Sequence, residues 1–380
     1  MTLQEIAKLT LADGSPVKAE VSCQVVRSRE NVTKAGKPYL DLEISDGTAT
    51  EKFKIWEDSD AYESFHDLED GDCVRLDGSF WRNQYGLNVD RMRVRRLEKQ
   101  EALALFAGSP ERRAALDRDW ADLSAQVEAI RDPRLRLLGQ TFLKEHGEKF
   151  RRTAAARDYH HARRGGLLEH TTQMMRAGAA LETAYPALNW DLVRTGILFH
   201  DCGKLWELDY PAQGFASPMT TIGELLGHIV VGIELVNKLW RSLESAPEFA
   251  APAQPPREIV REHLLHLIAS HHGQKEYGAP VTPRTPEAWM LHHIDNIDAH
   301  LEMLAQTYAE KTQAGPGIYD YRRPLEGRAV SPLPKWEGYY PWRVSLRPDP
   351  LLPCSAPALR GSLVPKLYWG TGLSGAILLL

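Results

Sequence analysis

The sequence predicts a multidomain chain in which a small N-terminal β-barrel is followed by an all-α domain. The chain has 380 residues, 43% of them apolar, which is enough to bury two separate cores. Residues 15–97 are rich in β-branched residues and glycine turns, whereas residues 98–310 place apolar side chains three and four positions apart. Beyond residue 310, proline and glycine recur without any period. These three observations decide the fold class.

The strand signals of residues 15–97 follow one another closely. Residues 17–26, VKAEVSCQVV, alternate in part between apolar and polar side chains, as a half-buried strand does. A turn at 34–38 precedes a second strand, and Asp46-Gly47 is a strong hairpin signal. Further turns at Asp70-Gly71 and Asp77-Gly78 divide residues 68–94. About five short strands with frequent glycine turns predict a small barrel over residues 15–97.

The rest of the chain divides into three parts. Residues 98–150 carry an amphipathic pattern punctuated by Pro110 and Pro133, which predicts a helical connector. Residues 151–310 predict a helical domain with helices near 166–185, 189–205, 222–239, 258–271 and 285–307. Residues 311–380 are interpreted as an extended or disordered tail.

Composition narrows the function classes. A net charge of −5 gives no global sign of a polyanionic partner, although a local basic channel is enough to bind nucleic acid. The four cysteines, Cys23, Cys73, Cys202 and Cys354, form no CxxC pair, which disfavours a zinc ribbon or a disulfide framework and indicates a reducing compartment. There is no secretion signal and no apolar run of ~20 residues that would span a bilayer. We therefore expect a cytoplasmic protein.

Histidines and acids that could carry chemistry are concentrated in the helical region. His200 and Asp201 lie near the end of an apolar run, TGILFHDCGKL, where burial is costly unless a cation or a direct ion pair compensates them. His170 lies about 30 residues upstream in GGLLEHT, and Asp295 lies downstream in LHHIDNID. Two nitrogen and two carboxylate ligands suit Mn, Fe, Co, Ni or Zn rather than Ca. The alternative is a histidine–carboxylate pair without a metal.

Further nitrogen ligands indicate a second metal. His228 and the pair His271-His272 follow, and Asp201 can bridge two cations ~3.5–4 Å apart. Lys204 shares a helical face with His200 and Asp201 and can neutralise charge on a phosphoryl group. The alternative interpretation of Lys204 is a surface lysine favoured by the helix dipole.

At this point a family resemblance becomes clear. The motifs GGLLEHT, LFHDCGK, GHIVVG, SHHG and HHIDNIDAHLE, in this order, resemble those of HD-domain phosphohydrolases. More narrowly, they are similar to the bacterial YhaM-type 3′–5′ exoribonucleases, which join an N-terminal OB-fold to an HD domain. The segments KAGKPYLDLEISDGT, KFKIW and GDCVRLDG resemble nucleic-acid-binding OB-folds. The resemblance covers roughly residues 15–310. HHGQKEYGAPVTP departs from the pattern of the HD-GYP phosphodiesterases, because Gly273 stands where they have Glu.

The resemblance implies roles for named residues. His170, His200, Asp201 and Asp295 would bind one divalent metal, and Asp201, His228 and one or both of His271 and His272 a second. Mn²⁺ is the first expectation, with Co²⁺ or Fe²⁺ as alternatives. Asp201 and Lys204 would be the catalytic residues, and Asp298 could orient a ligand from the face it shares with Asp295. The implied reaction is 3′–5′ hydrolysis of single-stranded RNA or DNA to nucleoside 5′-monophosphates.

Five residues are candidates for contacts with the strand. Arg163 and Arg164 precede the first predicted ligand, where they contact phosphates or belong to a solvated loop. Trp81 and Tyr85 flank a polar hairpin and could stack on bases, and Lys37 could supply charge, although most aromatics in a small barrel are core. Cys202 is expected to be a small buried hydrophobe rather than a ligand.

Two rival functions stay open. One is a phosphodiesterase or nucleotidase acting on small or cyclic nucleotides, with the barrel as a regulatory module. The other is a non-catalytic protein that binds single strands. Loss of turnover with retained RNA binding in Asp201→Ala would separate an enzyme from a binding protein. The resemblance permits an oligomer without establishing one.

Overall fold

A computed structural model describes residues 1–13, 15–59, 62–83, 86–156, 161–215, 218–250, 253–310 and 313–334. The chain divides into two compact units, Met1–Ser331 and Pro332–Leu380, and nearly all of the second lies outside the described residues. The expectations for Tyr85 and for most of the tail therefore fall outside them too. No described helix is both long enough and apolar enough to cross a membrane.

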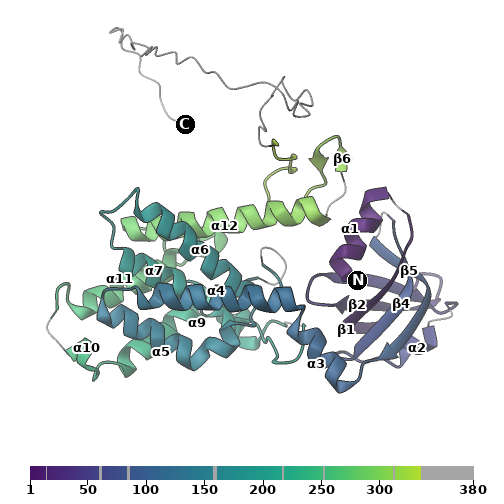
Figure 1. Ribbon diagram of the computed structural model, residues 1–380, viewed down its shortest axis with the longest axis horizontal. Coiled ribbons are helices and arrows are strands. Elements are labelled where there is room, and N and C mark those ends of the chain that lie inside the picture. The colour runs from purple at the N-terminus through teal and green to yellow at the C-terminus, as the bar shows by residue number, and fades with distance from the viewer. Residues whose placement is uncertain are drawn as a thin grey trace, which may run out of the picture. The chain divides into compact units, whose positions relative to one another are not determined.

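The N-terminal region is a five-stranded antiparallel sheet (Figure 1). Its strands are β1 (Val17–Val32), β2 (Pro38–Ser45), β3 (Thr50–Trp56), β4 (Cys73–Asn83) and β5 (Gly86–Arg96), in the order β3-β2-β1-β4-β5. The long strand β1 pairs with β4 through its first half and with β2 through its second half. Inward-facing residues such as Val21, Leu42, Phe53 and Leu76 form one apolar core. Short helix α2 (Tyr62–His66) joins β3 to β4.

The expected closure into a barrel is not observed. Among the described strands, β3 and β5 are the two edges and share no ladder pairing. In β5 the residue Arg91 has a left-handed backbone (φ 52°), and the pairing with β4 skips there from Asp90 to Arg93. Such a bulge bends an edge strand away from regular pairing. The N-terminal region is thus an antiparallel sheet with charged edges rather than a hydrogen-bonded barrel.

Helix α1 (Leu3–Asp13) was not anticipated by the sequence analysis. Leu3 and Ile6, three positions apart, are fully buried in the core of the sheet. The N-terminus of α1 is fixed by the Asp46 carboxylate, which accepts the backbone N–H of Leu3 at 2.7 Å. The three-residue apolar spacing was therefore the signal, but it is too short to stand out against the strand signals that follow.

The remaining helices build a second core. They are α3 (Lys99–Ala107), α4 (Pro110–Glu128), α5 (Pro133–Phe150), α6 (Gly166–Glu182), α7 (Trp190–Phe199), α8 (Lys204–Glu207), α9 (Thr221–Ser242), α10 (Pro247–Ala250), α11 (Arg257–Ser270) and α12 (Pro286–Glu310). Leu123 of α4 and Phe142 of α5 are fully buried in the same cluster as Phe199, Leu267 and Leu291. The helices α4 and α5 are therefore part of the helical domain's core as well as a connection to the sheet.

Two local departures from the expected helices shape the site. The expected helix 189–205 is broken, since α7 ends at Phe199 and residues 200–203 form a turn before α8. Helix α9 is kinked at Gly227, whose backbone (φ 68°, ψ 165°) is not helical. Residues 313–319, expected in the tail, instead form a small hairpin of β6 (Gln313–Gly315) and β7 (Ile318–Tyr319).

Candidate metal centre

Helices α6 and α12 and the turn after α7 bring histidines and aspartates to one buried place in the helical domain. His170 comes from the first turns of α6, and His200 and Asp201 from the turn after α7. Asp295 comes from the middle of α12. The Nε2 atoms of His170 and His200 are 3.2 Å apart, and His170 Nε2 lies 3.2 Å from Asp295 Oδ1. His200 Nε2 lies 3.3 Å from Asp201 Oδ2. These contacts join the four residues predicted for the first metal.

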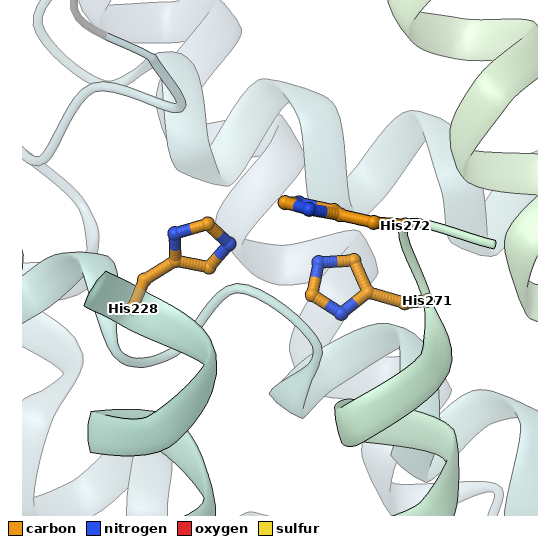
Figure 2. A group of neighbouring side chains, drawn as sticks. All are labelled: His228, His271 and His272. Atoms are coloured by element: carbon orange, nitrogen blue, oxygen red, sulfur yellow. The ribbon is translucent and has the colours of Figure 1, made fainter. Parts of the chain in front are cut away.

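His228 and His271 approach Asp201 through its other oxygen. His228 Nε2 lies 3.4 Å from Asp201 Oδ1, and His271 Nε2 lies 3.6 Å from the same oxygen. Figure 2 shows the rings of His228, His271 and His272 gathered from α9 and from the end of α11. Asp201 therefore stands between the two groups of histidines with one carboxylate oxygen directed to each. This is the arrangement that a bridging carboxylate requires.

Every one of the five histidines is anchored by its Nδ1 atom. Backbone carbonyls hold three of them, with Ile197 O accepting from His200 at 2.8 Å, Ile268 O from His271 at 2.8 Å and Tyr277 O from His272 at 2.7 Å. Carboxylates hold the other two, as Asp298 contacts His170 at 2.7 Å and Glu207 contacts His228 at 3.1 Å. A donating Nδ1 leaves the Nε2 lone pair free, which is how metal-binding histidines are usually oriented.

Three polar atoms at the centre are buried without a hydrogen-bond partner. They are Asp201 Oδ1, His228 Nε2 and His271 Nε2. A buried polar atom that lacks a partner costs about 1–3 kcal/mol. Both imidazole nitrogens lie within 3.6 Å of the Asp201 oxygen, and three such atoms with lone pairs fit a bound cation far better than they fit one another. The residues present therefore suit a divalent metal.

Charge at the centre is arranged to hold a cation. Burial by itself opposes the charged form of His170, but hydrogen bonds to Asp295 and Asp298 raise its pKa to about 9. Burial lowers the pKa of His271. Burial, together with the neighbouring rings of His271 and His228, lowers the pKa of His272 to about 3. Burial would raise the pKa of Asp201, but Lys204 and His200 outweigh it and hold that pKa well below its usual range. The site thus combines the ionised Asp201 carboxylate with neutral imidazoles at His271 and His272, whereas the His170 imidazole is held in its protonated form when no cation is bound.

Lys204 is part of this centre rather than a surface residue. Its ammonium group is buried and lies 2.6 Å from Asp201 Oδ2. Lys204 was predicted to share a helical face with Asp201, and the two side chains do lie together, although a turn followed by α8 places them instead of one continuous helix. The interpretation of Lys204 as an exposed helix-end lysine is wrong, because the side chain is buried.

Two glycines let α9 place His228. Gly227 breaks the helix immediately before His228, and the Glu207 carboxylate accepts both the backbone N–H of His228 at 3.0 Å and its ring Nδ1–H. A Cβ on Gly203 would lie 1.9 Å from the His228 carbonyl oxygen, so only glycine permits this approach of the two backbones. Cys202 is fully buried in the apolar core, as expected of a small hydrophobe.

The candidates for strand contact lie in different surroundings. Arg163 donates to Glu169 at 2.8 Å and to Glu302 at 2.5 Å, and Arg164 donates to the carbonyls of Pro211 and Ala212. A phosphate would have to replace these partners, so neither arginine belongs to a simple solvated loop. Both line a cavity of about 1120 Å³ that does not include the centre's histidines. Trp81 is half-buried on β4, and Lys37 is exposed at the turn before β2.

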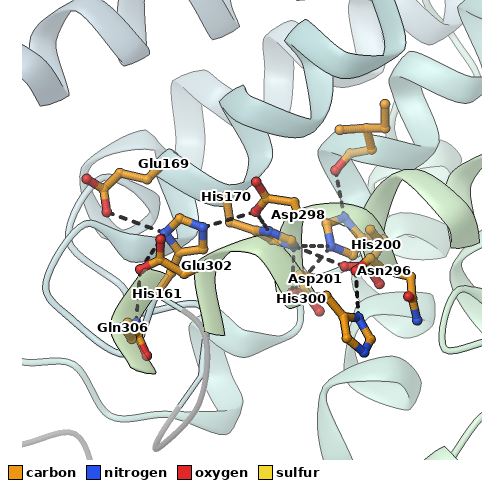
Figure 3. Close-up of polar contacts among 12 residues, drawn as sticks. His161, Glu169, His170, His200, Asp201, Asn296, Asp298, His300, Glu302 and Gln306 are labelled. Carbon is orange, nitrogen blue, oxygen red and sulfur yellow. Dashed lines mark hydrogen bonds and ion pairs between the residues drawn. The ribbon is translucent and has the colours of Figure 1, made fainter. Parts of the chain in front are cut away.

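Sequence reasoning missed two residues that support the centre. Glu207 fixes His228, and its signal was weak because one glutamate three residues after Lys204 is unremarkable in a helix. His161 stands just before Arg163 and Arg164 in the sequence, yet it is buried and its Nε2 lies 3.0 Å from Asp298 Oδ2 (Figure 3). The expectation that Asp298 orients a ligand agrees with its contact to His170.

Comparisons with known proteins point to one family. Residues 167–300 match the HD domain family. The chain is also 31% identical over 288 residues to the 3′–5′ exoribonuclease YhaM of Geobacillus sp. (strain WCH70). That alignment covers 75% of this chain and 83% of the relative, so it is much longer than the segment that matches the HD domain.

Proposed function

The chain belongs to the YhaM-type family of HD-domain proteins, and on this premise we propose that it is a metal-dependent 3′–5′ exoribonuclease. It hydrolyses the phosphodiester bonds of single-stranded RNA to nucleoside 5′-monophosphates. The observation that carries the proposal is the convergence of anchored histidines on both oxygens of the buried Asp201 carboxylate.

The centre is proposed to hold two divalent cations, with Mn²⁺ first and Co²⁺ or Fe²⁺ as alternatives. His170, His200, Asp201 and Asp295 would bind one, and Asp201, His228, His271 and His272 the other. The support is the mixed nitrogen and oxygen donor set, which suits these metals. Such a pair of cations, when bound, lowers the pKa of water and stabilises the charge of an in-line phosphoryl displacement.

The chain's own residues prepare the rest of the reaction. The carboxylate of Asp201 is kept ionised by Lys204 and fixed between the two histidine groups. Lys204 is proposed to turn its ammonium toward the negative charge that develops on the scissile phosphate. The five Nδ1 anchors hold the imidazoles in place, so little reorganisation is needed during the reaction.

The sheet region is proposed to be an OB-fold that guides the strand. An OB-fold is a five-stranded, partly open barrel, which agrees with the strand order, the split pairing of β1 and the open edges. Trp81 would stack on a base, with Lys37 near the backbone. Arg163 and Arg164 are proposed only as cavity-lining residues near the path of the strand. The proposed domains are 15–97, 98–150 and 151–310.

A reducing, cytoplasmic location is part of the proposal. Cys23, Cys73 and Cys202 are free thiols in the part of the chain that the structure describes. Free thiols are the normal state in such a compartment.

The experiment is cleavage of a single-stranded RNA by metal-stripped protein to which Mn²⁺ is returned. The RNA is labelled at its 5′ end in one sample and at its 3′ end in another, and Asp201→Ala is run beside the wild type. The proposal predicts a shortening ladder from the 5′ label and only a mononucleotide from the 3′ label. Both should vanish without metal and in the variant.

Other outcomes separate the rival functions. Absence of cleavage with Mn²⁺, Co²⁺, Fe²⁺ and Mg²⁺ would refute the exonuclease. Turnover of a cyclic dinucleotide under the same conditions would then identify a small-nucleotide phosphodiesterase. Equal rates on a DNA strand of the same sequence would remove the preference for RNA.

A further inference from the structure

We propose that His161 is a positioning residue of the metal centre and that it acts on His170 through Asp298. His161 lies outside residues 167–300, the segment that matches the HD domain. The inference rests on the proposed function only in that a divalent cation binds at His170. It does not depend on what the enzyme cleaves.

One carboxylate oxygen joins the two histidines. Asp298 Oδ2 accepts from His170 Nδ1 at 2.7 Å and from His161 Nε2 at 3.0 Å. Figure 3 shows this row from His161 through Asp298 to His170 and His200. Two ligand atoms bound to one tetrahedral zinc ion by bonds of 2.0–2.2 Å would stand about 3.3 Å or more apart. The two contacts here, at 2.7 Å and 3.0 Å, are shorter than that and are hydrogen-bond distances. A third cation between these residues is therefore disfavoured.

The hydrogen bond from His161 prevents a rotation of the Asp298 carboxylate that the hydrogen bond from His170 still allows. A carboxylate held only by its contact to a metal-binding histidine can rotate and carry the imidazole with it. With His161 as a second donor, the plane of Asp298 is fixed, and so is the direction of His170 Nε2 toward His200 and Asp295. Partners behind a ligand are known to set the affinity of metal sites in this way.

The local backbone is bent to deliver this ring. His161 has φ 48°, a left-handed conformation that residues other than glycine rarely adopt. Its carbonyl accepts the N–H of Arg163 at 2.8 Å, and a Cβ on Gly166 would lie 1.9 Å from that same carbonyl oxygen. The turn thus closes so tightly that Gly166 has to be glycine. This turn places His161 in a buried position within the stretch HHARRGG.

The charged side chains near Nδ1 of His161 form ion pairs with one another. Glu169 Oε2 and Glu302 Oε1 lie 3.6 Å and 4.0 Å from His161 Nδ1, and Arg163 pairs with both carboxylates. This explains why Arg163 is held within the domain. It also leaves the Nε2 side of His161 directed at Asp298.

The test measures metal affinity rather than RNA cleavage. Dissociation constants for Mn²⁺ are obtained by competition with a chelating dye for the wild type, His161→Leu, His161→Gln and the control His300→Leu. His300 is exposed on α12, two residues after Asp298, and its ring Nδ1 contacts the Asn296 carbonyl. We expect His161→Leu to weaken binding roughly 10–100-fold, the range seen when such a partner is removed. His161→Gln, whose amide N–H can reach Asp298, and His300→Leu should stay within about threefold.

A double-mutant cycle shows whether the effect passes through Asp298. In the Asp298→Asn background, His161→Leu should lose most of its effect, because the link is already broken. Additive losses, or wild-type affinity in His161→Leu, would overturn the proposal. If His161→Leu does not fold, His161→Asn replaces it, since asparagine tolerates the left-handed backbone and its shorter amide falls short of Asp298. A wild type that binds Mn²⁺ but does not cleave RNA refutes the function alone.

Discussion

Replacing Gly203 by alanine should disable the metal centre by moving one helix. The new Cβ would lie 1.9 Å from the His228 carbonyl oxygen and 2.7 Å from the Gly232 backbone nitrogen. Both are backbone atoms and cannot rotate away. Ordinary contact begins at 3.4 Å, so α8 and α9 must separate by about 1.5 Å. Since Gly203 has ordinary helical angles (φ −65°, ψ −20°), the effect comes from crowding alone.

The separation acts on the second group of ligands. His228 would retreat from Asp201, to which its Nε2 is now 3.4 Å away. A misplacement of about 1 Å at a reacting centre costs roughly 10²-fold in rate, and overpacking costs about 1–3 kcal/mol of stability. We therefore expect Gly203→Ala to fold but to cleave RNA at least about 100-fold more slowly, with weaker Mn²⁺ binding.

The matched control is Gly232→Ala on the facing helix. Its Cβ would meet Cys202 Sγ at 3.3 Å and the Gly203 nitrogen at 3.4 Å, contacts that small shifts relieve. Initial rates of RNA cleavage, Mn²⁺ affinity and thermal unfolding are measured for both variants. If Gly203→Ala keeps activity within about threefold of the wild type, the steric reasoning is refuted.

Three further predictions follow from the same site and from the sheet. Lys204→Met removes the ammonium group beside Asp201 and should lower kcat about 10²–10³-fold. RNA affinity in a filter-binding assay should hardly change, and an equal loss of affinity would contradict the catalytic role of Lys204. Chelation should lower the thermal unfolding midpoint, because Mn²⁺ at 100 times its Kd stabilises the folded state by about 2.7 kcal/mol, and calorimetry with returned Mn²⁺ should restore it. Trp81→Ala should weaken binding of single-stranded RNA by about 1–3 kcal/mol in fluorescence anisotropy and leave hydrolysis at saturating RNA unchanged; no change in binding would remove Trp81 from the strand path.

Several of the proposed ligand residues were accessible from the sequence because they interrupt apolar helical segments. His170, His200 and Asp201 stand among buried residues where a charge has no local partner, and only a cation or an ion pair can compensate them. The starts of the helices were accessible as well, because the signals that set them are local. Caps such as Asn189 on α7 act within one turn, so sequence neighbours determine them.

The supporting residues were not accessible, because their partners are distant in the chain. His161 meets Asp298 across 137 positions, and Arg163 meets Glu302 across 139. In the sequence, arginines that pair with distant carboxylates cannot be told from arginines that bind a phosphate. The irregular pairing of β5 was not accessible either, since the left-handed backbone at Arg91 interrupts its ladder with β4 without a glycine to indicate the bulge.

The most direct test of the central claim is a crystal of the protein soaked in Mn²⁺ and measured for anomalous scattering. Two peaks ~3.5–4 Å apart should flank Asp201, one beside His170, His200 and Asp295 and the other beside His228 and His271. Asp201→Asn crystals should lose at least one peak. Absence of any peak within bonding distance of Asp201 would contradict the account.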